Sequence, residues 1–180
     1  MTSEPRISVL VLGLGNILCG DDGAGVVAVH KLRRGWQLPP GVRVVDGGTL
    51  GLDLLALVAA SDRVILVDAV RADAPPGTIV RLAGDEVASA VYERLSPHQI
   101  GVADLLAGAA WCERYPRDVV IVGVVPESVE LQIGCTPAVT ASLDALVFAV
   151  LAELHAHGVD PVCRTVATGP VDDGARALGL

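Results

Sequence analysis

The hydrophobic and polar positions of this chain follow two alternating patterns: short apolar runs, and longer segments with helical spacing. The continuous apolar runs predict strands that are buried on both faces, as in a parallel sheet. We expect such strands at Ile7–Leu12, Val42–Val45, Val64–Val67 and Val119–Val125. Segments with apolar residues three or four positions apart predict helices between the strands. We expect helices at Val26–Leu32, Leu50–Ala60, Glu86–Leu95, Ser96–Trp111 and Thr136–Gly158.

Two weaker patterns add possible short strands. Gly77–Leu82 alternates and predicts an edge strand, and Val129–Ile133 predicts a short additional strand. Strands that alternate with helices indicate a largely parallel sheet with helices on both faces, which is an α/β fold. In such folds, ligand sites lie outside the carboxyl ends of the strands.

The length and composition set further limits. A chain of 180 residues fits one domain. We expect a single α/β domain over residues 1–158, and a loose tail over residues 159–180, where Gly and Pro interrupt any periodicity. Since 52% of the residues are hydrophobic and only 3% are aromatic, the core must consist mainly of Val, Leu, Ile and Ala.

The charge and the cysteines exclude some classes of partner. The net charge of −8 argues against nucleic acid, which requires a basic surface. The four cysteines form no CxxC pair, so they indicate neither a zinc finger nor a disulfide framework. We expect a cytoplasmic protein that does not contact a membrane, because no signal peptide and no uninterrupted apolar span of ~18 residues is visible. We also expect a monomer.

The glycine-rich loop after the first predicted strand invites comparison with dinucleotide-binding loops. That fingerprint requires a third glycine three residues after Gly15, and Leu18 stands there instead. Asp21 and Asp22 would also repel a pyrophosphate. A nucleotide-dependent α/β enzyme is therefore the weaker alternative.

Acidic residues follow three of the predicted strands. Asp21 and Asp22 come after the first strand, and Asp46 and Asp68 end the second and third. Such acids also cap helices and turns, so a structural role is as compatible with the sequence as a site. Two adjacent acids, however, leave one for capping and one for chemistry.

His98 is the most informative histidine. It lies in the first turn of a helix that opens with the capping box Ser96–Gln99. The positive end of the helix dipole there favours neutral imidazole, the form that binds metals, although a solvated histidine is equally compatible. Asp22, Asp68 and His98 together form a carboxylate–imidazole set that suits a borderline divalent metal. The remaining histidines are expected to be ordinary helix residues: His30, His155 and His157.

Five segments, in order along the chain, resemble the hydrogenase maturation endopeptidases. The resemblance extends over roughly Ile7–His157. The segments are Gly13–Gly25, Asp46–Gly51, Val67–Ala69, Ser96–Asp104, and Val122–Ser128 followed by Ile133–Pro137. The resemblance implies a three-layer α/β fold with a five-stranded twisted sheet. It also implies an aspartyl-type endopeptidase that removes a C-terminal extension from the precursor of the nickel–iron hydrogenase large subunit. Cleavage follows nickel insertion, so nickel carried by the substrate serves as the recognition signal.

The resemblance also assigns residues. The family's metal-contacting acid matches Asp22, its second acid matches Asp68, and its histidine matches His98. The motif Asp46–Thr49 matches one proposed to act in recognition or cleavage, which makes Asp46 a fourth catalytic candidate. The first acid is Glu in some members, and the shorter Asp could shift the metal or admit a bridging water.

Three groups are candidates for activating the water molecule: the metal, Asp22 and Asp46. Cys19 in the glycine-rich loop is expected to be a packed thiol rather than a ligand. A non-catalytic chaperone that checks for nickel is the main alternative function, because the same residues would bind the precursor without cutting it.

Overall fold

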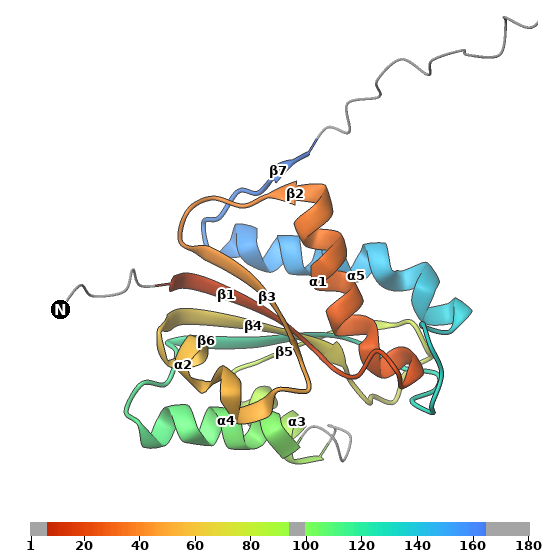
Figure 1. The fold of residues 1–180 in the computed structure, drawn as a ribbon, viewed down its shortest axis with the longest axis horizontal. Coiled ribbons are helices and arrows are strands. Elements are labelled where there is room, and N and C mark those ends of the chain that lie inside the picture. The colour runs from red at the N-terminus through yellow and green to blue at the C-terminus, as the bar shows by residue number, and fades with distance from the viewer. Residues whose placement is uncertain (1–6, 94–99, 165–180) are drawn as a thin grey trace, which may run out of the picture.

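A computed structural model describes residues 7–93 and 100–164 and contains a five-stranded sheet (Figure 1). The strand order is β3-β1-β4-β6-β5, and all neighbours are parallel except β5, which runs antiparallel to β6 at one edge. The strands are β1 (Ile7–Leu14), β3 (Val42–Gly48), β4 (Ser61–Ala69), β5 (Ile79–Ala83) and β6 (Asp118–Val124). The predicted α/β class and the predicted edge strand are confirmed.

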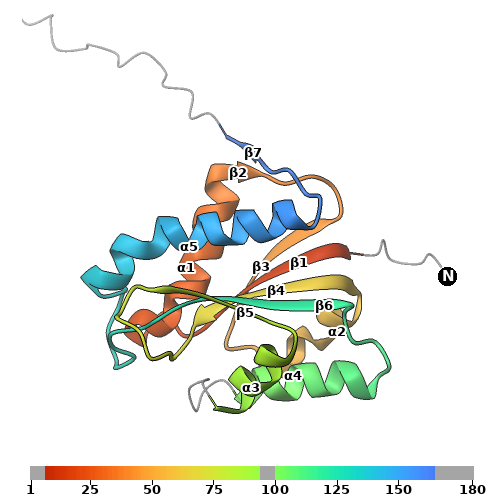
Figure 2. The ribbon, with the colours of Figure 1, turned by 180° about the vertical axis from the view of Figure 1, so that it is seen from behind.

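Helices cover both faces of the sheet, as the two opposite views show (Figures 1 and 2). One face carries α1 (Ala24–Gly35) and α5 (Pro137–Ala156), and the other carries α2 (Leu55–Ala59), α3 (Asp85–Glu93) and α4 (Ile100–Trp111). Short 3-10 helices precede α1 and α2; these are η1 (Gly20–Gly23) and η2 (Gly51–Leu54).

The alternation of side chains along β1 produces a separate hydrophobic core on each face. Leu10 and Leu12 join the core under α2, α3 and α4, whereas Val9 and Val11 join the core under α1 and α5. All four side chains are at most 1% exposed. The continuous apolar run in the sequence therefore has the predicted cause, which is burial on both faces.

Helix α5 is long and apolar enough to cross a membrane by length and composition, yet it is a core helix of this domain. Its buried residues pack against the sheet, and Glu153 on α5 accepts hydrogen bonds from the guanidinium of Arg81 on β5. Those hydrogen bonds raise the pKa of Arg81, against the opposing effect of desolvation. The N-cap is Thr136, as the sequence predicts.

Several segments differ from the sequence prediction. Val129–Ile133 is not a strand: only Gln132 forms an isolated bridge, to Cys19. Strand β3 continues through Asp46 to Gly48, where a turn was expected, because the register shifts by one residue between Gly13 and Leu14 of β1. The helix expected over residues 50–60 is divided into η2 and α2.

The short antiparallel pair β2 (Trp36–Gln37) and β7 (Val162–Cys163) was not anticipated. Strand β7 lies within the first residues of the segment expected to be a loose tail. Arg164 follows β7, and its backbone N–H and side chain donate to the carbonyls of Gly35 and Trp36 at the end of α1. The chain is thus held against α1 as far as Arg164.

Helix α1 approaches the sheet unusually closely at Gly25. A Cβ atom at this position would lie 2.0 Å from the carbonyl oxygen of Val67 and 2.6 Å from that of Leu14. In the dinucleotide fingerprint, the third glycine allows close contact between helix and strand. Gly25 has that role here, whereas Leu18 occupies the position of the third glycine. This contact fixes η1, immediately before α1, against the carboxyl ends of β1 and β4.

Replacement of Gly25 by Ala should destabilise the fold by about 3 kcal/mol, because the new methyl group meets backbone atoms that cannot rotate away. The midpoint of urea unfolding measures this loss. Gly35→Ala is the matched control, since a Cβ there meets nothing within 4 Å and alanine favours a helix by up to about 1 kcal/mol. Equal midpoints for the two variants would contradict the close contact.

Candidate active site at the carboxyl edge of the sheet

Asp21 is completely buried, and its carboxylate accepts hydrogen bonds from three residues of another loop. Its Oδ2 accepts the backbone N–H groups of Glu127 (2.8 Å) and Ser128 (3.1 Å) and the hydroxyl of Thr136 (3.0 Å), while Oδ1 accepts the N–H of Thr136 (2.7 Å). The buried charge needs no cation, because these donors and the positive end of α5 stabilise it. Asp21 therefore connects η1 to the segment between β6 and α5.

Backbone hydrogen bonds reinforce the same connection. Gln132 accepts from the N–H of Gly20 (2.8 Å) and donates to the carbonyl of Leu18 (2.9 Å), and the N–H of Asp21 donates to Ser128 (2.9 Å). The N–H groups of this glycine-rich loop are thus used within the protein instead of pointing toward a phosphate. This arrangement argues against the nucleotide-binding alternative.

Asp22 has a different environment, although it is only 2% exposed. Its Oδ2 accepts the backbone N–H of Asn16 at 2.7 Å, and the side-chain oxygen of Asn16 accepts the N–H of Leu18 at 3.0 Å. No described residue donates a hydrogen bond to its second oxygen, Oδ1. Of the two adjacent acids, Asp21 is the structural one, and Asp22 retains an oxygen that can bind a ligand.

Close backbone packing fixes the position of Asp22. Gly15 adopts a φ of 111°, and a Cβ atom on it would lie 1.7 Å from the carbonyl oxygen of Asp22. A side chain at residue 15 would therefore displace Asp22. The glycine-rich loop thus serves to bring the backbone around an acid.

Asp68 is the second buried acid at this edge, and it is 1% exposed. It is the penultimate residue of β4, paired in register with Gly123 of β6, and its Oδ1 accepts the N–H of Ala69 at 2.7 Å. Because η1 contacts β4, Asp22 and Asp68 lie at the same edge of the sheet. Burial of two carboxylates there is costly unless they bind a cation or donors.

Asp46 is also near the carboxyl end of its strand, level with Gly13 of β1, but it lies on the opposite face from Asp68. The Oδ2 atom of Asp46 lies 2.8 Å from Nε2 of His30 on α1, within hydrogen-bond distance. The side chain of Asp46 is 38% exposed. Val44, two positions earlier on β3, packs in the core under α1 and α5, whereas Leu66, two positions before Asp68, packs in the opposite core. Strand alternation therefore directs Asp46 and Asp68 to opposite faces of the sheet.

The fourth predicted residue, His98, lies outside the described residues. Within the described ranges, no group of three or more His, Cys, Asp or Glu side chains is placed to hold a metal ion. The structure thus brings two predicted site residues, Asp22 and Asp68, to one edge and places Asp46 apart from them. Sequence reasoning missed the partner of Asp46: His30 lies four residues after the buried Val26, a spacing that puts it beside the buried stripe of α1.

Two cysteines adjoin the loops that Asp21 connects. Cys19 precedes η1, and Cys135 precedes the cap of α5; both are free thiols of intermediate exposure. Burial raises the pKa of the Cys135 thiol, and the nearby charge of Asp21 raises it further. At neutral pH Cys135 is therefore a neutral thiol.

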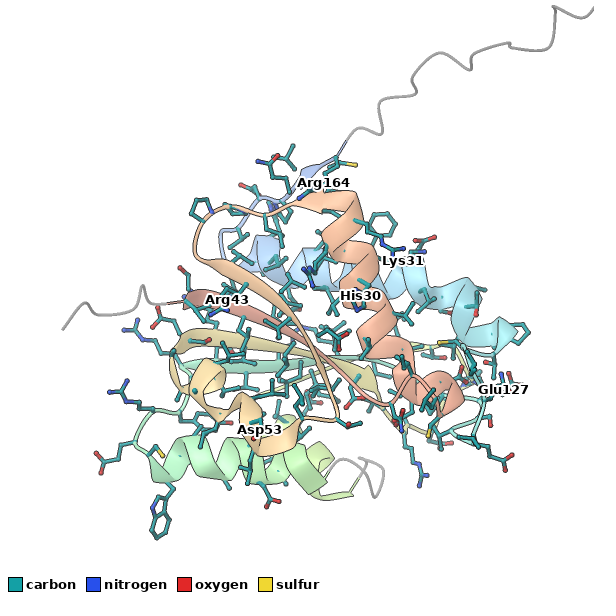
Figure 3. The ribbon with its side chains drawn as sticks, viewed as in Figure 1. His30, Lys31, Arg43, Asp53, Glu127 and Arg164 are labelled. Atoms are coloured by element: carbon teal, nitrogen blue, oxygen red, sulfur yellow. The ribbon has the colours of Figure 1, made fainter. Side chains whose placement is uncertain are left out.

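Figure 3 shows the two ends of the sheet. Arg43, near the start of β3, and Glu127, after β6, mark opposite ends, and Glu127 lies at the end occupied by η1. His30 and Lys31 project from α1 between them. The carboxyl edge is therefore formed by loops from both halves of the chain.

Comparisons with known proteins show which family the sequence matches. The sequence model described as hydrogenase maturation protease matches residues 26–153. The hydrogenase 2 maturation protease of Escherichia coli K12 is 40% identical over 157 residues, which cover 87% of this chain and 96% of that protein. The hydrogenase expression/formation protein HupM of Azotobacter chroococcum is also 40% identical, over 87% of this chain and 75% of that protein.

Solved structures show the same likeness. The hydrogenase maturating endopeptidase HybD from E. coli superposes with a TM-score of 0.83 at 40% identity, over 87% of this chain and 98% of that one. The [NiFe] hydrogenase maturation protease HybD from Thermococcus kodakarensis gives a TM-score of 0.67 at 29% identity, over 79% of this chain and 96% of that one.

The same chemical change at the two adjacent acids should separate their roles. Asp21→Asn should destabilise the protein by about 3 kcal/mol, because an amide keeps one acceptor oxygen and turns its NH₂ group toward buried donors. Asp22→Asn should cost about 1 kcal/mol or less, since the amide oxygen can still accept from Asn16. Urea unfolding curves measure both changes, and a larger loss for Asp22→Asn would reverse the assignment.

Proposed function

Since the chain belongs to the hydrogenase maturation protease family, we propose that it removes a C-terminal extension from the precursor of a nickel–iron hydrogenase large subunit. The names of similar proteins, a hydrogenase 2 maturation protease among them, support this substrate. The buried pair Asp22 and Asp68 at the carboxyl edge, where α/β enzymes bind their ligands, is the observation that carries the proposal.

We further propose that nickel already inserted in the precursor is the recognition signal. Asp22, Asp68 and His98 would contact that nickel, with the unused Oδ1 of Asp22 as one ligand. Carboxylate and imidazole donors suit a borderline divalent metal. The nickel belongs to the substrate, so the enzyme needs no resident metal.

Binding of the nickel would also position the scissile bond of the precursor. A precursor held through its metal presents the extension in one register, and this removes much of the entropic cost of placing the scissile bond. The metal can also polarise the scissile carbonyl or a water molecule. We assign Asp46 to recognition of the extension, because its carboxylate is paired with His30 on the other face of the sheet.

Catalysis, and not binding alone, distinguishes this proposal from a chaperone that checks for nickel. A chaperone would leave the mass of the precursor unchanged after incubation, whereas the protease shortens it. The family and the E. coli relatives, which are named as proteases and endopeptidases, favour the protease. We propose that it acts in the cytoplasm as a monomer.

The decisive experiment is mass spectrometry of the precursor after incubation with the purified chain. Wild type should shorten nickel-loaded precursor and leave nickel-free precursor intact. Asp22→Asn and His98→Ala should each reduce the rate on the order of 100-fold, because each removes one contact to the metal. Circular dichroism should show both variants folded.

Asp160→Asn and His155→Ala provide matched controls. These two residues form an exposed pair near the end of α5, and their substitution should leave processing unchanged. Normal processing by both Asp22→Asn and His98→Ala would refute the nickel contact. Cleavage of nickel-free precursor at the wild-type rate would refute nickel as the signal.

A further inference from the structure

A groove of about 460 Å³ lies between α1 and the two loops that Asp21 connects. Its apolar lining comes from both loops and from the first turns of α1. Its polar lining comes from further along α1 and from the end of β3. The residues that the argument uses are Ile17, Leu18, Ile133, His30, Arg34 and Asp46.

Large apolar side chains are exposed in this groove. Ile17 is 54% exposed, Leu18 is 51% exposed and Ile133 is 87% exposed. They lie on two loops whose relative position is fixed by the carboxylate of Asp21 and by the backbone pairing of Gln132. A clustered, preorganised apolar surface of this kind indicates binding of a partner, since exposure alone is unfavourable.

The charge of the groove is opposite to that of the whole chain. The chain carries a net charge of −8, yet the groove lining contains two positive side chains, Lys31 and Arg34, and one negative side chain, Asp46. Asp46, the acidic residue among the described lining residues, is paired with His30. Lys31 pairs with Asp144, and Arg34 forms no ion pair with any described residue. The guanidinium of Arg34 is therefore available to a carboxylate.

We propose that this groove binds the C-terminal extension of the precursor as an extended peptide. Apolar side chains of the extension contact Ile17, Leu18 and Ile133, and an acidic group of the extension binds Arg34. This inference rests on the proposed function and identifies the surface that binds the extension of the substrate. The groove includes Gly20 and Gly23 of η1, the same element that carries Asp22, so a bound extension continues toward the carboxyl edge.

A peptide fits the observations better than a second copy of the chain does. Two copies that each carry a net charge of −8 repel one another, whereas an acidic group on an apolar peptide complements the basic border of the groove.

Binding is tested by NMR with a synthetic peptide of the extension from the precursor used in the processing assay. The control peptide has every Asp and Glu replaced by its amide, and its C-terminus is amidated. Amide resonances of Ile17, Leu18 and Ile133 should shift, and the acidic peptide should bind about three- to tenfold more tightly than the control. Arg34→Gln should abolish that difference, whereas Arg33→Gln, at an exposed position outside the groove, should retain it.

Alkylation gives a second readout that needs no variant. Cys135 lines the groove, so saturating peptide should slow its reaction with iodoacetamide, while the exposed Cys112 should react at an unchanged rate. Equal rates for Cys135 with and without peptide, or resonance shifts confined to another surface, would overturn the proposal. Resonance shifts at the groove that depend on protein concentration alone would assign it to a second copy instead.

Processing kinetics separate this proposal from the proposed function. Arg34→Gln and Ile17→Ser should raise KM for nickel-loaded precursor about three- to tenfold with little change in kcat, because they weaken binding and not the chemical step. Phe148→Ser, at a 61% exposed apolar position on α5, is the matched control. If wild type cuts the precursor and both groove variants keep its KM, the groove proposal fails and the function stands. If wild type leaves nickel-loaded precursor uncut, the proposed function fails.

Discussion

The carboxylate of Asp21 is the interaction on which the arrangement of this edge depends. One fully buried acid accepts hydrogen bonds from residues 106 to 115 positions later in the chain. It receives them from backbone N–H groups and a hydroxyl, so neutral donors stabilise the buried carboxylate without a second titratable side chain. Without it, only backbone hydrogen bonds, such as those of Gln132 with Leu18 and Gly20, would connect the glycine-rich loop to the segment before α5.

Most of the fold could be predicted from the sequence, because strands that are buried on both faces consist of continuous apolar residues. The runs that became β1, β4 and β6 are continuously apolar, and the Thr-Pro pair at residues 136 and 137 marks the start of α5. Segments set by tertiary contacts were harder to predict. Val129–Ile133 has the composition of a strand, but only Gln132 finds a backbone partner. The end of β3 depends on a register shift against β1, which a single sequence does not reveal.

The candidate site shows the same division. An unusual pair of acids after a glycine-rich loop was visible, and so was the acid at the end of β4. Which of Asp21 and Asp22 is structural depends on donors in a loop more than 100 residues away, so the sequence alone could not decide it. The pairing of His30 with Asp46 likewise follows from the strand order, which places β3 beside β1 and under α1. Local patterns reveal which groups are present, and topology determines which of them meet.

The long sequence separation of the contacts to Asp21 has a consequence for biosynthesis. The loop around Asp22 is complete only when Thr136, at the start of α5, has joined it. Closing a loop of this length carries an entropic cost that is recovered only once the distant partner is present. The edge that carries Asp22 can therefore be completed only after the chain has been synthesised as far as Thr136.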